Sequence, residues 1–168
     1  MDIKARLARV HFATLKPDLS QLSESEKVAL THCVNASNIM TFAYLEQAFA
    51  GNKKLYRELR ARSDDEGGYL FQYFMLHGCP WDEFHHKEPF IAGIGPKPKF
   101  GSFYPEGMTE MEWNTHLEAH PEDREQFESN YTVIKRRENT LRAVSYADAY
   151  ADYVADAAWE LRAAAALL

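Results

Sequence analysis

The residues of this sequence that could do chemistry begin with its histidines, of which there are seven. His116 and His120 stand four apart, in His-Leu-Glu-Ala-His, and Glu112 precedes His116 by about one helical turn. That spacing places both rings on one side of a helix, but the zinc signature needs a glutamate directly after the first histidine. Pro121 also disfavours helical geometry at His120. We therefore keep His116 and His120 as weak metal candidates and expect ordinary surface histidines.

Other arrangements that support catalysis are missing from the sequence. There is no Gly-x-Ser-x-Gly elbow, and neither Cys33 nor Cys79 has a catalytic neighbourhood. Residues 93–101 lack the spacing of a phosphate loop, and their prolines remove backbone donors that a phosphate would need. Acidic pairs such as Asp64-Asp65 and Asp82-Glu83 are common in any acidic helical protein. We predict no catalytic residue, no cofactor-binding residue and no cofactor in this chain.

The composition indicates one folded domain over residues 1–168. Hydrophobic residues make up 46% and aromatic residues 13%, which is ample material for a core in a chain of this length. The net charge of −6 argues against a general nucleic-acid binder, which needs a basic face. Cys33 and Cys79 are expected to be buried thiols. No segment approaches 18 uninterrupted apolar residues and the first residues are no secretory leader, so we expect a cytoplasmic protein without a membrane partner.

Helices are expected over residues 23–76, after an N-terminal arm over residues 1–22. Ser23 and Glu26 fit a capping box, and Gly51 supplies a stop. This predicts a helix of about seven turns, with an interruption near residues 35–38 left open. Two shorter helices follow, over 53–62 and from the Ser63–Glu66 cap to Leu76. The long helix is expected to bury one broad face made of Leu30, Cys33, Val34, Ser37, Met40, Thr41, Tyr44, Leu45 and Ala48.

Residues 77–108 are expected to form an ordered irregular crossing. Glycine and proline are too dense there for a regular element. A flexible linker, however, is depleted in large apolar residues. The crossing should therefore be held against the helices by its aromatic side chains, which are Trp81, Phe84, Phe90, Phe100, Phe103 and Tyr104.

The C-terminal third is expected to hold a helical segment, a hairpin and a last helix. Thr109 opens the segment 109–128 with a second capping box. Residues 130–145 alternate like a β-hairpin around a loop of four or five residues at 136–139. The helix 146–168 is capped by Ser145 and lacks a C-terminal stop signal, which predicts a longer native chain. The predicted fold class is mainly α: a helical domain with a long ordered Pro/Gly/aromatic loop and one small β-hairpin.

Three segments in this order resemble the N-terminal region of bacterial proteins of the dipeptidyl-peptidase III family of zinc peptidases. They are YFMLHGCPWDEFHHKEPFI (73–91), GPKPKFGSFYPEGMTEMEW (95–113) and NYTVIKRRENTLRAVSYADAY (130–150). Two departures stand out: Cys79 occupies the place of a second glycine and Lys135 that of an arginine. The resemblance covers most of the chain from about Ser23 onward.

The resemblance implies a domain without catalytic residues of its own. The family's chemistry uses a His-Glu-x-x-Gly-His helix and a Glu-Glu-x-Arg helix that together hold zinc, and neither is present in these residues. Both would lie beyond Leu168, so zinc is expected in a full-length relative and not in this chain. We therefore expect a non-catalytic N-terminal domain that packs beside the rest of its own chain and helps to wall a peptide cleft.

Two other functions remain open at this stage. The chain could be a self-standing helical binding module, dimeric through the exposed face of the helix 146–168. It could also be a small metal-dependent enzyme that uses His116 and His120. Enzyme activity is therefore uncertain for the protein as a whole: we expect none from this chain alone, whereas a full-length protein could be a zinc-dependent peptidase. The sequence does not name the substrate.

Overall fold

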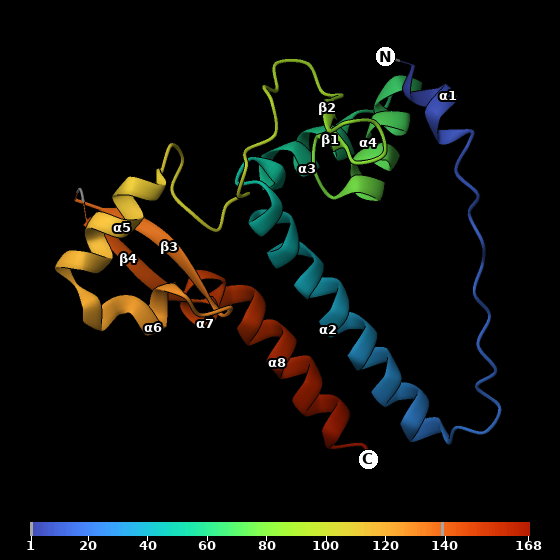
Figure 1. The fold of residues 1–168 in the computed structure, drawn as a ribbon. Coiled ribbons are helices and arrows are strands. Elements are labelled where there is room, and N and C mark those ends of the chain that lie inside the picture. The colour runs from blue at the N-terminus through green and yellow to red at the C-terminus, as the bar shows by residue number, and fades with distance from the viewer. Residues whose placement is uncertain (1, 139) are drawn as a thin grey trace.

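The computed structural model describes residues 2–138 and 140–168 and is predominantly helical, as the sequence predicts (Figure 1). Two small antiparallel sheets accompany the helices. The elements follow in the order α1 (Ile3–Leu7), α2 (Glu24–Ala48), α3 (Asn52–Ala61), α4 (Asp65–His77), β1 (Trp81–Asp82), β2 (Glu88–Pro89), α5 (Glu110–Ala119), the 3-10 turn η1 (Pro121–Asp123), α6 (Arg124–Phe127), β3 (Thr132–Arg137), β4 (Thr140–Ser145), α7 (Tyr146–Ala149) and α8 (Ala151–Ala165).

The helix starts follow the local capping signals. Ser23 forms the predicted capping box with Glu26, and α2 then runs for 25 residues without the interruption considered near residues 35–38. The side chains of Thr109 and Ser145 cap α5 and α7 by accepting backbone N–H bonds. For α4 the cap is Asp64, one residue later than Ser63, where the cap-like sequence begins.

Helices α2 and α8 pack antiparallel along a seam of small residues. Ala29, Ala36 and Ala43 of α2 are buried at intervals of seven, and so are Ala157 and Ala164 of α8. A repeat of seven keeps one narrow stripe of each helix facing its partner. Alanine at each contact lets the two backbones approach closely, so this stripe replaces the face that the sequence predicted as buried.

The predicted buried face of α2 is wrong over most of its length. Leu30, Val34, Met40 and Tyr44 are exposed, and Cys33 is an exposed free thiol rather than a buried one. Only Leu45, near the end of the helix, is buried as expected. The large side chains dominate the periodic pattern, whereas the packing contact is made by the smaller alanines beside them.

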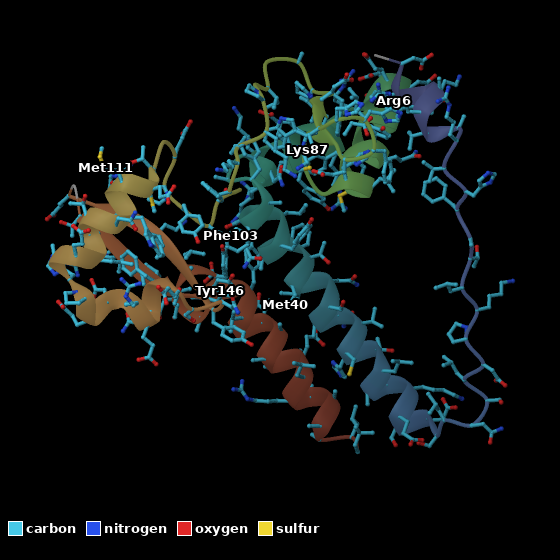
Figure 2. All side chains as sticks on the ribbon, in the orientation of Figure 1. Arg6, Met40, Lys87, Phe103, Met111 and Tyr146 are labelled. Carbon is cyan, nitrogen blue, oxygen red and sulfur yellow. The ribbon has the colours of Figure 1, made fainter. Side chains whose placement is uncertain are left out.

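The buried residues fall into three clusters rather than one core. The first lies under α1, α3 and α4 and contains Ile3, Leu7, Leu45, Leu59, Tyr73, Phe74 and Phe90. The second joins α5 and α6 to the hairpin through Leu117, Phe127, Ile134 and Leu141. The third, with Ala43, Val133 and Tyr150, connects the hairpin to α2, where Phe103 and Tyr146 pack against it (Figure 2).

The accessible surface of the chain is large for its mass. It amounts to 11839 Å² for 19.3 kDa. A compact monomer of that mass would expose about 8,500 Å². The difference of roughly 3,000 Å² agrees with the open arrangement in Figure 1, where the α3–α4 lobe and the hairpin lobe lie on either side of the α2–α8 pair.

The crossing over residues 77–108 is ordered, and it is tied to its surroundings by both ring packing and hydrogen bonds. Trp81 is buried and its Nε1 donates to the carbonyl of Gly95 at 2.8 Å. The N–H of Ser102 donates to Gln47 of α2, and the carbonyl of Phe103 accepts from Ile134 of β3. The expectation of no regular element is wrong, because β1 pairs antiparallel with β2.

Two details of the crossing differ from its sequence-based description. Phe84 and Phe100 are largely exposed instead of pressed onto the helices. Gly101 has φ 58°, and a Cβ on it would lie 2.9 Å from the carbonyl oxygen of Gln47. Glycine is therefore required where the crossing passes against α2.

The C-terminal elements correct two predicted boundaries. The register pairs Arg137 with Thr140, so the strands extend further and the loop is two residues long rather than four or five. Of these two, Asn139 lies outside the described residues. The predicted helix 146–168 is divided at Tyr150, which has φ −126° and ψ 34°, and α8 ends at Ala165.

The N-terminal arm contains one short helix followed by an extended strap. Helix α1 buries Ile3 and Leu7 against the first cluster. The chain then runs to α2 with no regular element over 10–19, and it leaves Phe12 74% and Leu15 88% exposed. In Figure 1 this strap passes well to the side of α2.

Candidate functional site

The structure uses the two candidate metal ligands in local packing and pairing. His116, near the end of α5, stacks on Phe127 at 4.6 Å and its Nε2 lies 2.9 Å from Asp123 Oδ2. His120 ends α5 in non-helical geometry, as expected before Pro121, and its Nδ1 is 3.3 Å from Glu122. Among residues 2–138 and 140–168, no three His, Cys, Asp or Glu side chains converge as a metal site requires.

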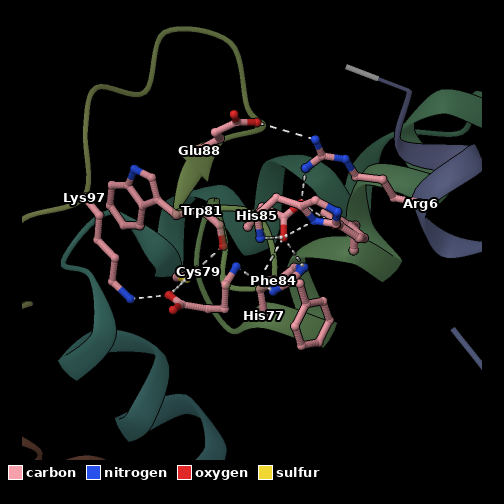
Figure 3. A network of polar contacts seen from close by, with 11 residues as sticks. Arg6, His77, Cys79, Trp81, Phe84, His85, Glu88 and Lys97 are labelled. Atoms are coloured by element: carbon pink, nitrogen blue, oxygen red, sulfur yellow. Dashed lines mark hydrogen bonds and ion pairs between the residues drawn. The ribbon is translucent and has the colours of Figure 1, made fainter. Parts of the chain in front are cut away.

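A different polar cluster lies where α4 leads into β1 (Figure 3). Its hydrogen bonds and ion pairs converge on Asp82. Helix α4 ends at His77, and Gly78 turns the chain with φ 64°, a left-handed conformation that suits glycine. Cys79 and Pro80 follow, and the next two residues, Trp81 and Asp82, lie in the interior. This turn explains how a carboxylate comes to be fully buried directly after an aromatic core residue.

Asp82 is buried and surrounded by donors from three separate segments. Tyr73 of α4 donates to Oδ2 at 2.6 Å, and Arg6 of α1 forms an ion pair with the same oxygen. His85 Nδ1 lies 3.0 Å from the carboxylate. The backbone N–H groups of Phe84 and His85 donate to Oδ1 at 2.9 and 3.0 Å. A buried carboxylate is stable only with such a full set of partners.

The surroundings fix the charge of this cluster. Burial alone would raise the pKa of Asp82, but the hydrogen bonds from Tyr73, His85 and Arg6 outweigh it and hold that pKa well below its usual range. Burial, together with the hydrogen bond to Asp82, raises the pKa of Tyr73 to about 12. Burial lowers the pKa of His77.

His77 is the one member of the cluster with an unmet hydrogen bond. Its Nδ1 accepts the N–H of Glu83 at 3.2 Å, which places the ring proton on Nε2. Nε2 is buried without a hydrogen-bond partner among the described residues and lies 3.8 Å from Asp82 Oδ1. The contact is therefore electrostatic and longer than a hydrogen bond.

The geometry makes the Asp82 cluster a clamp and not an acid–base site. A general base needs a pKa near the working pH and room for a substrate, whereas Asp82 is fully buried and its lowered pKa keeps it charged at neutral pH. A surface hollow of about 300 Å³ adjoins it, lined by Arg6, Arg9, Val10, Tyr73, Phe84 and His85. Arg6, Tyr73 and His85 already bind Asp82. The hollow therefore offers no pair of unpartnered side chains for acid–base catalysis. The cluster instead ties α1 to α4 and to the start of the crossing.

Sequence reasoning missed this cluster. Asp82 appeared only as one of several acidic pairs, and Arg6 was not singled out. The buried Cys79 was predicted correctly; burial raises the pKa of its thiol, which makes it a poor nucleophile. The available signal was a Gly-Cys-Pro-Trp-Asp turn next to a helix, which points to a buried Asp without naming its partners.

No helix in the described part of the chain is both long and apolar enough to cross a membrane. No protein-family model matches the sequence. Among curated proteins, Nudix hydrolase 3 of Arabidopsis thaliana is 25% identical over 167 residues, which cover 82% of this chain and 22% of the plant protein.

Two solved structures match almost the whole chain. Dipeptidyl-peptidase III from Caldithrix abyssi superimposes with a TM-score of 0.94 at 36% identity and covers 98% of this chain. Dipeptidyl-peptidase III from Corallococcus sp. strain EGB gives 0.89 at 34% identity over 99%. This chain spans only 31% of the length of either. The resemblance read from the sequence is confirmed: in sequence and in fold the chain is similar to a part of bacterial dipeptidyl-peptidase III, consistent with its N-terminal region.

Proposed function

We propose that this chain is the non-catalytic N-terminal domain of a dipeptidyl-peptidase III-like zinc peptidase. It packs beside a catalytic part that lies outside the 168 residues and contributes to one wall of the peptide cleft. The observation that carries the proposal is the pair of structural matches, which cover nearly all of this chain but 31% of each dipeptidyl-peptidase III chain. Zinc would then be bound by the catalytic part, because the sequence contains no His-Glu-x-x-Gly-His helix.

The surface of the chain supports this proposal independently. Roughly 3,000 Å² more is exposed than a compact monomer of this mass would expose, starting from 11839 Å². Obligate interfaces bury about 2,000–5,000 Å² in total, which is roughly 1,000–2,500 Å² on each partner, so an interface of this kind would account for a large part of the excess. A domain that packs on a larger neighbour is expected to have such an excess. We also propose a cytoplasmic setting, which suits the free thiols of Cys33 and Cys79.

The reading frame around this chain gives the direct test. We expect it to continue past Leu168 and to encode a His-Glu-x-x-Gly-His helix. The longer protein should hold stoichiometric zinc and release dipeptides from peptide substrates, while the 168-residue chain does neither. A native stop codon directly after Leu168, or peptidase activity of the 168 residues alone, would contradict the proposal.

A homodimeric binding module is the second candidate, and exposed apolar side chains of α8 favour it. Trp159 is 63% and Leu161 52% exposed. Ala157 is buried against α2 and Tyr153 bonds to Glu46 of the same chain. Neither is therefore free to bind a partner, and a dimer would have to use Trp159 and Leu161. Sedimentation velocity separates the two functions: a tight dimer that Leu161→Glu dissociates would favour the module.

A further inference from the structure

The α2–α8 pair has a polar side that holds the two helices in register. His32 Nδ1 lies 2.6 Å from Glu160, and Asn35 bonds to the same carboxylate at 3.4 Å. Toward the other end, Tyr153 donates to Glu46 at 2.7 Å. All these groups lie on one side of the alanine seam, because His32 and Glu46 are displaced in the same direction from Ala36 and Ala43 around α2.

The opposite side of the pair is apolar and uncovered. At 100° per residue, Met40, Tyr44, Leu30 and Val34 span an arc of about 120° that begins beside the alanine seam and turns away from His32. They are 43%, 54%, 39% and 51% exposed. Met40 is seen next to the seam in Figure 2. On α8, Leu161 falls on this same side, since Glu160 marks the polar one.

We name these five residues, Leu30, Val34, Met40, Tyr44 and Leu161, the apolar side of the α2–α8 pair. A helix whose outer surface meets only water carries polar residues there. Ser37 and Thr41 are also exposed on this arc, so the surface is mainly but not wholly apolar. A surface that exposes several large apolar side chains together is typical of a protein interface.

We propose that the apolar side of the α2–α8 pair is the surface on which the catalytic part of the longer protein docks, through an apolar surface of its own. This inference rests on the proposed function. The length of the two dipeptidyl-peptidase III chains favours that occupant over a second copy of this chain. This chain spans 31% of each of them, so under the proposed function most of the longer protein is available to cover an unpartnered surface of this domain.

Cys33 provides a native probe of this surface. It lies on the same arc of α2, between Met40 and Tyr44 around the helix, and it is exposed, whereas Cys79 is buried and serves as an internal check of folding. The experiment compares thiol modification of Cys33 in the 168-residue chain and in the longer protein. In the longer protein we expect the rate to fall by more than about tenfold, because modification must wait for the interface to open.

Matched variants separate docking from a general loss of access. Asp156 is exposed on α8, and the thiol of Asp156→Cys in a Cys33→Ser background should react at the same rate in both proteins. Val34→Glu should restore the reactivity of Cys33 in the longer protein, while Asn38→Glu, exposed one turn further along α2, should not.

Each outcome has a distinct meaning. Equal Cys33 rates in a longer protein that holds zinc and cleaves peptides would overturn the docking surface and leave the proposed function intact. Protection of Cys33 in the 168-residue chain that grows with protein concentration would assign the surface to a second copy and overturn the inference. A longer protein with no zinc and no peptidase activity would remove the proposed function on which the inference rests, whatever the Cys33 rate.

Discussion

Replacing Asp82 with asparagine tests the clamp at its centre. The change keeps the shape of the side chain but removes its charge, and it turns one acceptor oxygen into a donor that faces existing donors. Removing one partner of a buried ion pair costs about 3–5 kcal/mol. The Arg6 side chain is 21% exposed and regains some hydration, so we expect Asp82→Asn to lower the free energy of unfolding by about 2–4 kcal/mol at pH 7.

The pH dependence of that loss has a definite sign. The folded-state pKa of Asp82 lies below its ordinary value of 3.8, so its ionised form stabilises the fold fully above that value. As the pH falls through 3.8 toward the folded-state pKa, this contribution disappears from the wild type. The asparagine variant has no such titration. The difference between the two proteins should therefore be constant from pH 5 to 7, within about 0.5 kcal/mol, and shrink below about pH 4.

Urea unfolding followed by far-UV circular dichroism measures this difference at pH 7, 5, 4 and 3. Asp156→Asn is the matched control, because Asp156 is exposed and we expect a change within about 0.5 kcal/mol. Tyr73→Phe removes one donor to Asp82 and should cost about 1–2 kcal/mol. If Asp82→Asn stayed within about 0.5 kcal/mol of wild type at pH 7, or if the gap widened on acidification, the clamp reading would be refuted.

Three further predictions concern the seam, a cap and the histidines. Ala36→Leu should overpack the α2–α8 seam and cost about 1–3 kcal/mol in urea unfolding, while Asn38→Leu on the outer side stays within about 0.5 kcal/mol; equal effects would contradict the seam. Thr109→Ala should cost about 1 kcal/mol through loss of the cap of α5, and an unchanged midpoint would argue against that cap. Calorimetric titration of the 168-residue chain with zinc should show no stoichiometric binding, whereas a 1:1 site lost in the His116→Ala/His120→Ala double variant would restore the metal-dependent enzyme.

The helix starts could be predicted because their signals are local. Ser23, Thr109 and Ser145 each bond to a backbone N–H three residues away, so the sequence contains both partners of the interaction. The hairpin was predicted for the same reason, since alternation needs only neighbouring residues. The predicted loop is too long because charged residues such as Arg136 and Arg137 are typical of a turn. In the structure they continue β3 with exposed side chains.

The clamp could not be predicted, because its members are distant in sequence. Arg6 lies 76 residues from Asp82, and its role depends on α1 docking against α4. Nothing near Arg6 distinguishes it from other basic residues on a charged N-terminal arm. The resemblance to dipeptidyl-peptidase III pointed to the segment that contains Asp82 but assigned it no partner.

The error on α2 is informative about the whole molecule. The sequence pattern around Leu30, Val34 and Tyr44 is that of a buried face, and the alanines beside it make the contact with α8. Both stripes are apolar, so the apolar surface of α2 is larger than one neighbouring helix can cover. A helix with two apolar stripes is typical of an element packed on two sides. Helix α8 covers the alanine stripe. The second stripe, around Leu30, Val34 and Tyr44, agrees with the proposal that the catalytic part of a longer protein packs there.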